Sequence, residues 1–171
     1  IDTDTFYKAW LKTEAAFTRT EADPLTYPLH IMIRYEIEKA IFNDQVDIAD
    51  LPTLWREKYQ EYLGLDIPDD LTGILQDIHW AGGSFGYFPS YALGHLYAAQ
   101  FKATMTKTLD FKSIFESGDY SPIFNWRQEH IWRYGGTVDP NEILENATGE
   151  PLNPQYWLDL VTNLYEEAYG L

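Results

Sequence analysis

Cysteine is absent from this sequence of 171 residues, and its absence excludes several kinds of chemistry. Without a thiol the chain has no disulfide, no cysteine nucleophile and no zinc site built from cysteine. A chain without cysteine also fits a reducing compartment, so we expect a cytoplasmic location.

Long apolar runs and positive charge are both scarce. The hydrophobic stretches are short and interrupted by charged residues, so we expect neither a membrane span nor the core of a signal peptide. Only 12 Lys and Arg residues stand against 27 Asp and Glu residues, which gives a formal net charge of -15. Such a charge disfavours phosphate backbones and anionic lipids, and we expect no nucleic-acid or membrane partner.

Three common catalytic motifs are missing as well. The sequence has no His-Glu-x-x-His, in which two imidazoles on one helical face hold zinc and the Glu polarises water. It has no Gly-x-Ser-x-Gly elbow, and no Lys of a phosphate-binding loop follows Gly86. We interpret the four histidines as isolated side chains with local hydrogen bonds and predict no metal ligand in this chain.

Apolar residues at helical spacing are present along most of the chain. Aromatic residues make up 16% of the sequence, and no strand pattern or internal repeat is evident. The spacing predicts an all-α fold, with residues 1–171 as a single helical domain. The predicted helices cover residues 4–18, 26–44, 47–64 with Gly64 as the stop, 89–109 largely buried, 121–136, 139–149 with Asp139 as the cap and Gly149 as the stop, and 153–171.

The first residues of the sequence suggest that more polypeptide precedes them. The sequence starts at Ile1 without an initiator Met, and a helix is already under way by Thr5. We therefore expect this chain to be a piece of a longer protein.

The segment "GILQDIHWAGGSFGYFPSY", residues 73–91, carries the densest polar and aromatic cluster. Gln76, Asp77, His79 and Trp80 lie close enough in sequence to hold one another, with Asp77 fixing a tautomer of His79. That arrangement suits a ligand-binding wall, but a buried polar knot that anchors a loop explains the same spacing. Both interpretations stay open on these residues alone.

Two tyrosines and one arginine are further candidates. Tyr87 and Tyr91 are four residues apart, so a helix that begins at Pro89 can direct both hydroxyls to one side, toward an oxyanion or into a core. Arg19 follows the first predicted helix, and its guanidinium can hold a substrate carboxylate in two hydrogen bonds. A salt bridge to the nearby Asp23 is the alternative for Arg19.

Taken together, "TRTEADPLTYPLHIMIRYEIEKAIF" and "GILQDIHWAGGSFGYFPSYALGHLYAAQ" resemble the carboxypeptidase Taq family of zinc-dependent metallocarboxypeptidases. The resemblance extends through essentially the whole chain but corresponds only to the C-terminal part of a family member. Thr18 departs from the aliphatic residue usual in the family. The matching motifs are Ile-Arg-x-x-Ala-Asp, at Arg19, Ala22 and Asp23, and Gly-x-x-Gln-Asp-x-His-Trp, at Gly73, Gln76, Asp77, His79 and Trp80.

The resemblance implies an enzyme that removes C-terminal residues from peptides, as part of a larger, mostly helical zinc-peptidase fold. It implies catalytic roles for His79, which would bind the peptide backbone, and for Tyr91, which would stabilise the oxyanion. Substrate binding would fall to Arg19 and Tyr87, with support from Gln76 and Asp77.

The zinc ligands that the resemblance implies are not in this chain. The family's His-Glu-x-x-His helix would lie upstream of Ile1, so zinc would be bound outside this chain, and the chain alone is expected to be inactive. Family members are commonly homodimers, and we expect one here. A noncatalytic helical interaction or dimerisation module is the alternative function.

Overall fold

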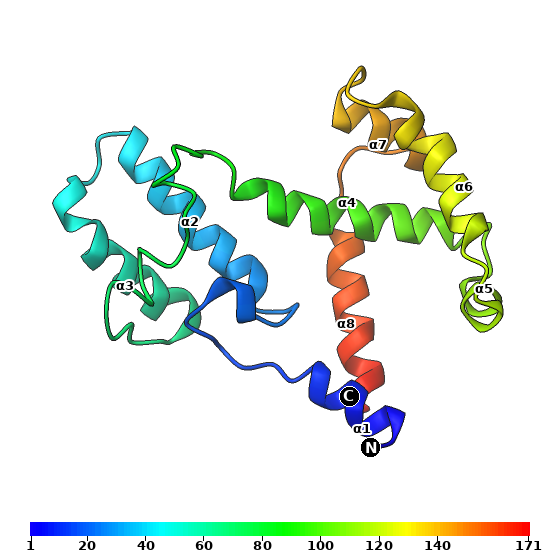
Figure 1. Cartoon of the computed structure of the whole chain (residues 1–171), viewed down its shortest axis with the longest axis horizontal. Coiled ribbons are helices and arrows are strands. Elements are labelled where there is room, and N and C mark those ends of the chain that lie inside the picture. Colours follow the sequence, from blue (N-terminus) through cyan, green and yellow to red (C-terminus); the bar gives the residue numbers. More distant parts are fainter. The chain divides into compact units, whose positions relative to one another are not determined.

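The computed structural model describes all residues 1–171 and contains helices but no strand (Figure 1). None of the helices combines the length and apolar character that a membrane span requires. The α-helices are α1 (Thr3–Trp10), α2 (Tyr27–Phe42), α3 (Leu51–Leu63), α4 (Pro89–Met105), α5 (Phe111–Ser117), α6 (Ser121–His130), α7 (Pro140–Thr148) and α8 (Gln155–Tyr169), with 3-10 turns η1 (Arg19–Glu21), η2 (Ile48–Asp50) and η3 (Trp132–Tyr134).

Helices with clear sequence signals at their ends are confirmed. Gly64 ends α3 in the left-handed conformation, with φ of 67°, where a residue without Cβ is least strained. In α7 the Asp139 carboxylate accepts the Asn141 N–H, and Gly149 ends the helix with φ of 87°. The prediction over 121–136 is correct for α6, but η3 replaces its last turn.

The first predicted helix is too long. α1 ends at Trp10, and Arg19 lies in η1 rather than at the end of that helix. The side chain of Asp23 accepts the Glu14 N–H, and the amide of Gln76 donates to the Phe17 carbonyl. Because distant side chains satisfy these backbone groups, the segment stays extended despite its amphipathic pattern.

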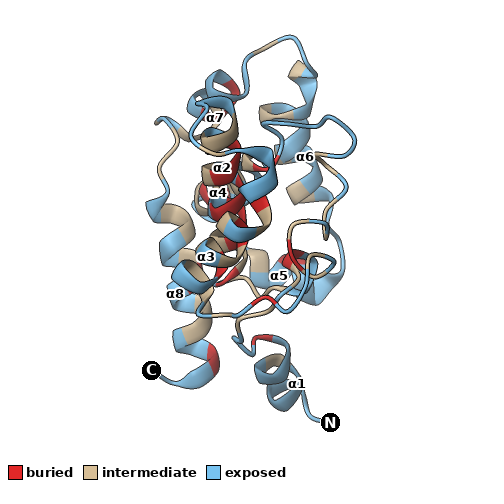
Figure 2. Cartoon of the chain, turned by 90° about the vertical axis from the view of Figure 1, so that its left-hand side faces the viewer, coloured by how far each residue is buried: buried red, intermediate tan, exposed pale blue.

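The chain divides into two compact units, and the single domain predicted from the sequence stays a prediction. Unit 1 contains residues 1–92 and 163–171, and unit 2 contains residues 93–162. In unit 1, α2 packs against α3, with Ile33, Ile37 and Trp55 at the centre of the core. Figure 2 shows the buried residues along α2 in red.

In unit 2 one amide side chain organises the interior. Gln100 of α4 is fully buried, and its Nε2 donates to the carbonyls of Glu150 and Pro151 and to the Thr148 hydroxyl. Its Oε1 accepts the Asn153 N–H. The segment between α7 and α8 is therefore fastened to α4. The expectation of a largely buried α4 is wrong, because only Ala99, Gln100 and Met105 are buried.

Candidate active site

A buried ion pair joins η1 to the loop before α4. The Nη2 of Arg19 lies 2.7 Å from Oδ1 of Asp77, and its Nε lies 3.2 Å from the same oxygen. The Nη1 of Arg19 donates to the hydroxyl of Tyr27 at 3.1 Å. Three of the five guanidinium N–H groups are thus engaged, which leaves one on each terminal nitrogen.

A second arginine, from α2, holds the other oxygen of Asp77. The Nε of Arg34 lies 2.7 Å from Oδ2, so each carboxylate oxygen has its own arginine. Arg34 is fully buried and also donates to the carbonyl of His30 and to Oε1 of Gln76. We refer to Arg19, Arg34 and Asp77 as the charge network, which carries a net charge of one positive unit.

The amide of Gln76 and the hydroxyl of Tyr59 complete the surroundings of the charge network. Oε1 of Gln76 accepts the backbone N–H of Arg19 at 3.0 Å, and its Nε2 donates to the hydroxyl of Tyr59 at 3.3 Å. Arg34 also donates to that hydroxyl, so we assign the proton of Tyr59 to the bond with Nδ1 of His30, 3.0 Å away.

Burial and the charge network shift several pKa values. Burial acts to raise the pKa of Asp77, but the hydrogen bonds and charges of Arg19 and Arg34 outweigh it and hold that pKa below its ordinary value. Burial acts to lower the pKa of Arg19, but the hydrogen bond and charge of Asp77 outweigh it and hold that pKa above its ordinary value. Burial, followed by the charges of Arg34 and Arg19, lowers the pKa of His30 to about 4. His30 is therefore neutral at pH 7.

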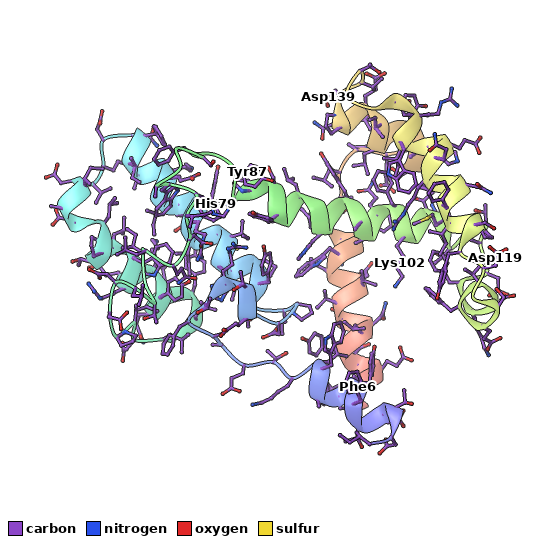
Figure 3. The ribbon with its side chains drawn as sticks, viewed as in Figure 1. Phe6, His79, Tyr87, Lys102, Asp119 and Asp139 are labelled. Atoms are coloured by element: carbon purple, nitrogen blue, oxygen red, sulfur yellow. The ribbon has the colours of Figure 1, made fainter.

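His79 lies at the edge of the charge network, inside an aromatic cluster. Its Nε2 is 3.0 Å from the hydroxyl of Tyr91, while its Nδ1 is buried without a hydrogen-bond partner. The ring packs against Phe88 with centroids 4.4 Å apart. Figure 3 shows His79 beside Tyr87, whose ring is stacked at 5.9 Å.

The two candidate tyrosines meet at the start of α4. Their ring centroids are 5.3 Å apart in an edge-to-face arrangement, with Tyr91 inside the first turn of α4 and Tyr87 two residues before the helix. The guanidinium of Arg19 lies 4.9 Å above the ring of Tyr91, within cation–π range. Arg19, His79 and both tyrosines therefore form one continuous cluster.

The structure brings together all six residues predicted for the site. The alternative for Arg19 does not occur, because Arg19 pairs with Asp77 while the carboxylate of Asp23 accepts the N–H and hydroxyl groups of Thr26. Oδ1 of Asp77 lies 3.8 Å from Nδ1 of His79, which is too far for a hydrogen bond. A buried group of hydrogen-bonded polar side chains thus lies beside a group of aromatic side chains.

Sequence reasoning missed two charged residues of α2. Arg34 is fully buried and Glu38 is 5% exposed, although both belong to types that normally face water. The sequence did contain a signal: His30, Arg34 and Glu38 recur every four residues, each one position beyond the apolar stripe of Leu29, Ile33 and Ile37. A regular polar row beside the core face of a helix is worth testing as a functional element.

The same residues do not form a metal site. No group of three or more His, Asp or Glu side chains is arranged to hold a metal ion. Both oxygens of Asp77 are occupied by arginines. The metal that the resemblance implies therefore finds no ligand set among these residues.

Comparison with known proteins gives one family. The family model for "Carboxypeptidase Taq (M32) metallopeptidase" matches residues 1–165. "Carboxypeptidase 1" of Bacillus subtilis is 51% identical over 172 residues, covering 100% of this chain and 34% of the relative. "Thermostable carboxypeptidase 1" of Thermus thermophilus is 38% identical over 171 residues, covering 99% and 34%.

A solved structure agrees with the sequence matches. The crystal structure of the M32 carboxypeptidase from Deinococcus radiodurans R1 superposes with a TM-score of 0.94 at 33% identity, covering 100% of this chain and 35% of that one. The chain therefore spans about a third of the length of the relatives it matches.

Proposed function

We propose a function from the premise that this chain belongs to the carboxypeptidase Taq (M32) family of metallopeptidases. The complete enzyme is a zinc-dependent metallocarboxypeptidase that removes C-terminal residues from peptides, and this chain supplies its C-terminal, substrate-binding part. Two curated relatives that cover the chain are named carboxypeptidases, which supports the reaction class. The zinc ligands belong to residues outside this chain.

The contact between His79 and Tyr91 is the observation that carries the proposal. An imidazole and a phenol 3.0 Å apart share one hydrogen bond, and a ligand oxygen that replaces this bond can accept from both the Nε2–H and the phenol O–H. His79 holds the peptide backbone, and Tyr91 stabilises the oxyanion that forms at the attacked carbonyl. The exposed Tyr87, stacked on His79, contributes to substrate binding.

Arg19 handles the carboxylate end of the peptide. One N–H group remains on each of its terminal nitrogens, and both can donate to a carboxylate. Asp77 fixes the guanidinium, and Gln76 fixes the backbone of Arg19, so the orientation is set before a peptide arrives. The net positive charge of the network favours an anionic group at this position.

The substitution His79→Ala in the complete enzyme tests the function. We expect turnover to fall by about a hundredfold or more, because loss of one transition-state hydrogen-bond donor has effects of that size. The zinc content, measured by atomic emission on the same sample, should stay at the wild-type value. Unchanged turnover would overturn the role of His79 and favour the interaction module.

Several further properties belong to the same proposal. We place the complete protein in the cytoplasm as a homodimer acting on peptides, and we expect residues 1–171 alone to be inactive. The absence of cysteine and the net charge of -15 support a reducing compartment and argue against nucleic-acid partners.

A further inference from the structure

Three polar residues form a buried row along α2. His30, Arg34 and Glu38 are spaced four residues apart, so they lie one above another on a single face of the helix. All three are buried, with exposed fractions of 0%, 0% and 5%. We call them the α2 polar row. Its three members face Tyr59 and the loop of residues 70–88 that carries His79.

The carboxylate of Glu38 joins two points of that loop. Its Oε1 accepts the indole N–H of Trp80 at 2.6 Å, and its Oε2 accepts the backbone N–H of Gly86 at 3.0 Å. Trp80 directly follows His79, and Gly86 directly precedes Tyr87. One side chain therefore closes the glycine-rich turn of residues 81–85 at both of its ends.

Arg34 holds the same loop one helical turn earlier. It bonds Asp77 and Gln76, which lie on the other side of His79. The loop is thus attached to α2 before His79 by Arg34 and after His79 by Glu38. Because α2 is a regular helix of 16 residues, the two attachment points have a fixed separation.

His79 depends on such external support. Residues 70–88 contain turns but no helix or strand, so only local backbone hydrogen bonds hold them, such as the one from the Ser84 N–H to the carbonyl of His79 at 2.8 Å. The imidazole itself has one hydrogen bond, to Tyr91, and its Nδ1 has none. Its position is set by packing against Phe88 and Tyr87 and by the course of the loop.

Glu38 is costly to bury. No lysine, arginine or histidine lies within ion-pair distance of its carboxylate, and its two partners are the neutral indole and amide donors. Removing a carboxyl group from water is unfavourable, and two hydrogen bonds offset only part of that cost. An apolar side chain at this position would avoid that cost. The carboxylate therefore indicates that its two hydrogen bonds are needed to fix the loop.

We propose that Glu38 is a positioning residue that holds His79 and Tyr87 in their reactive arrangement by closing the loop between Trp80 and Gly86. The inference rests on the proposed function, since it assigns Glu38 to the support of His79. It adds a residue outside the two sequence motifs that defined the site.

The substitution Glu38→Gln in the complete enzyme tests the proposal. Glutamine keeps the size and one acceptor oxygen but turns an NH2 group toward one of the two donors, so one bond is lost. We expect kcat to fall by about tenfold to a hundredfold while KM changes by less than about threefold, since small misplacements of reacting groups have such effects. Hydrogen exchange of residues 81–88, measured by mass spectrometry, should become faster.

Two further variants keep the test interpretable. Glu36→Gln is the matched control, because Glu36 lies on the same helix and bonds Tyr62 and Lys58 but does not contact the loop. It should leave kcat and the exchange of residues 81–88 unchanged. Trp80→Phe removes one donor while Glu38 stays intact, and it should shift both readouts in the same direction as Glu38→Gln if the latter folds poorly.

Each outcome decides the matter. Unchanged kcat in both Glu38→Gln and Trp80→Phe overturns the positioning role, as does a loss of activity that follows the folded fraction alone. If His79→Ala lowers turnover while these variants do not, the proposed function stands and only the role of Glu38 is wrong. If His79→Ala is also inert, both fail.

Discussion

Units 1 and 2 differ in the polar groups that they bury. Of the six buried polar or charged residues in the chain, Arg19, Thr26, His30, Arg34 and Glu38 lie in unit 1, and only the neutral Gln100 lies in unit 2. Burying ions costs stability that good pairing only balances. A unit that buries charged groups without gaining stability from them is a candidate for catalysis or ligand binding. A unit whose one buried polar residue is a neutral glutamine is better explained as a structural support.

The largest expected effect comes from removing Arg34. In Arg34→Met, Asp77 keeps only one arginine and the carbonyl of His30 loses a donor, so we expect unit 1 to lose about 3–5 kcal/mol of unfolding free energy. The control is Arg127→Met on α6, where an exposed arginine without an ion pair should change stability by less than about 0.5 kcal/mol. Hydrogen exchange of the 171-residue chain, read separately in each unit, measures both. Equal losses of unfolding free energy in Arg34→Met and Arg127→Met would contradict the proposed difference between the two units.

Acid should weaken unit 1 through His30. Its folded pKa of about 4 lies below the ordinary value of 6.5, so the neutral ring favours folding above pH 6.5 and this contribution is lost as the pH falls through 4. The loss is on the order of 3 kcal/mol, since each pKa unit is worth about 1.4 kcal/mol. Urea unfolding of wild type and His30→Asn between pH 7 and pH 4 tests this. Parallel pH curves for the two proteins would contradict it.

Gln100 provides the smaller test, in unit 2. Gln100→Leu leaves the Asn153 N–H and the acceptors around Thr148 without their partner, so we expect a loss of about 1–3 kcal/mol. Gln128→Leu on α6 is the matched control, because that side chain is exposed, and it should be nearly neutral. We expect hydrogen exchange of residues 148–153 to become faster in Gln100→Leu and to stay unchanged in Gln128→Leu. A stability loss in unit 1 as large as that in unit 2 would refute the assignment.

The parts of the fold that sequence predicted well are those with local causes. Gly64, Asp139 and Gly149 mark helix ends because each acts on its own few residues of backbone. α1 was misjudged because its continuation is prevented by Asp23 and by Gln76, the latter almost sixty residues away. A short stretch of sequence cannot show this effect, because the side chains that bond the backbone lie outside it.

The site shows the same division. The motif matches gave Arg19, Gln76, Asp77 and His79, and the spacing at the start of α4 gave the two tyrosines. The structure places all six in one cluster around Arg19, Asp77 and His79. The partner of Arg19 was not predictable from distance along the chain, because Asp23 is nearer but already serves the turn before α2. Arg34 and Glu38 escaped notice because charged residues on a helix are ordinarily read as its solvent face.

The charge network also sets an order for folding. Arg19 and Asp77 are 58 residues apart in sequence, whereas α2 and α3 are neighbours joined by a short connection. Closing a loop of that length costs about 4 kcal/mol of chain entropy, which the buried ion pair recovers only after the surrounding core has formed. The α2 and α3 pair should therefore form first and serve as a template on which the cluster around Arg19 and Asp77 becomes ordered later.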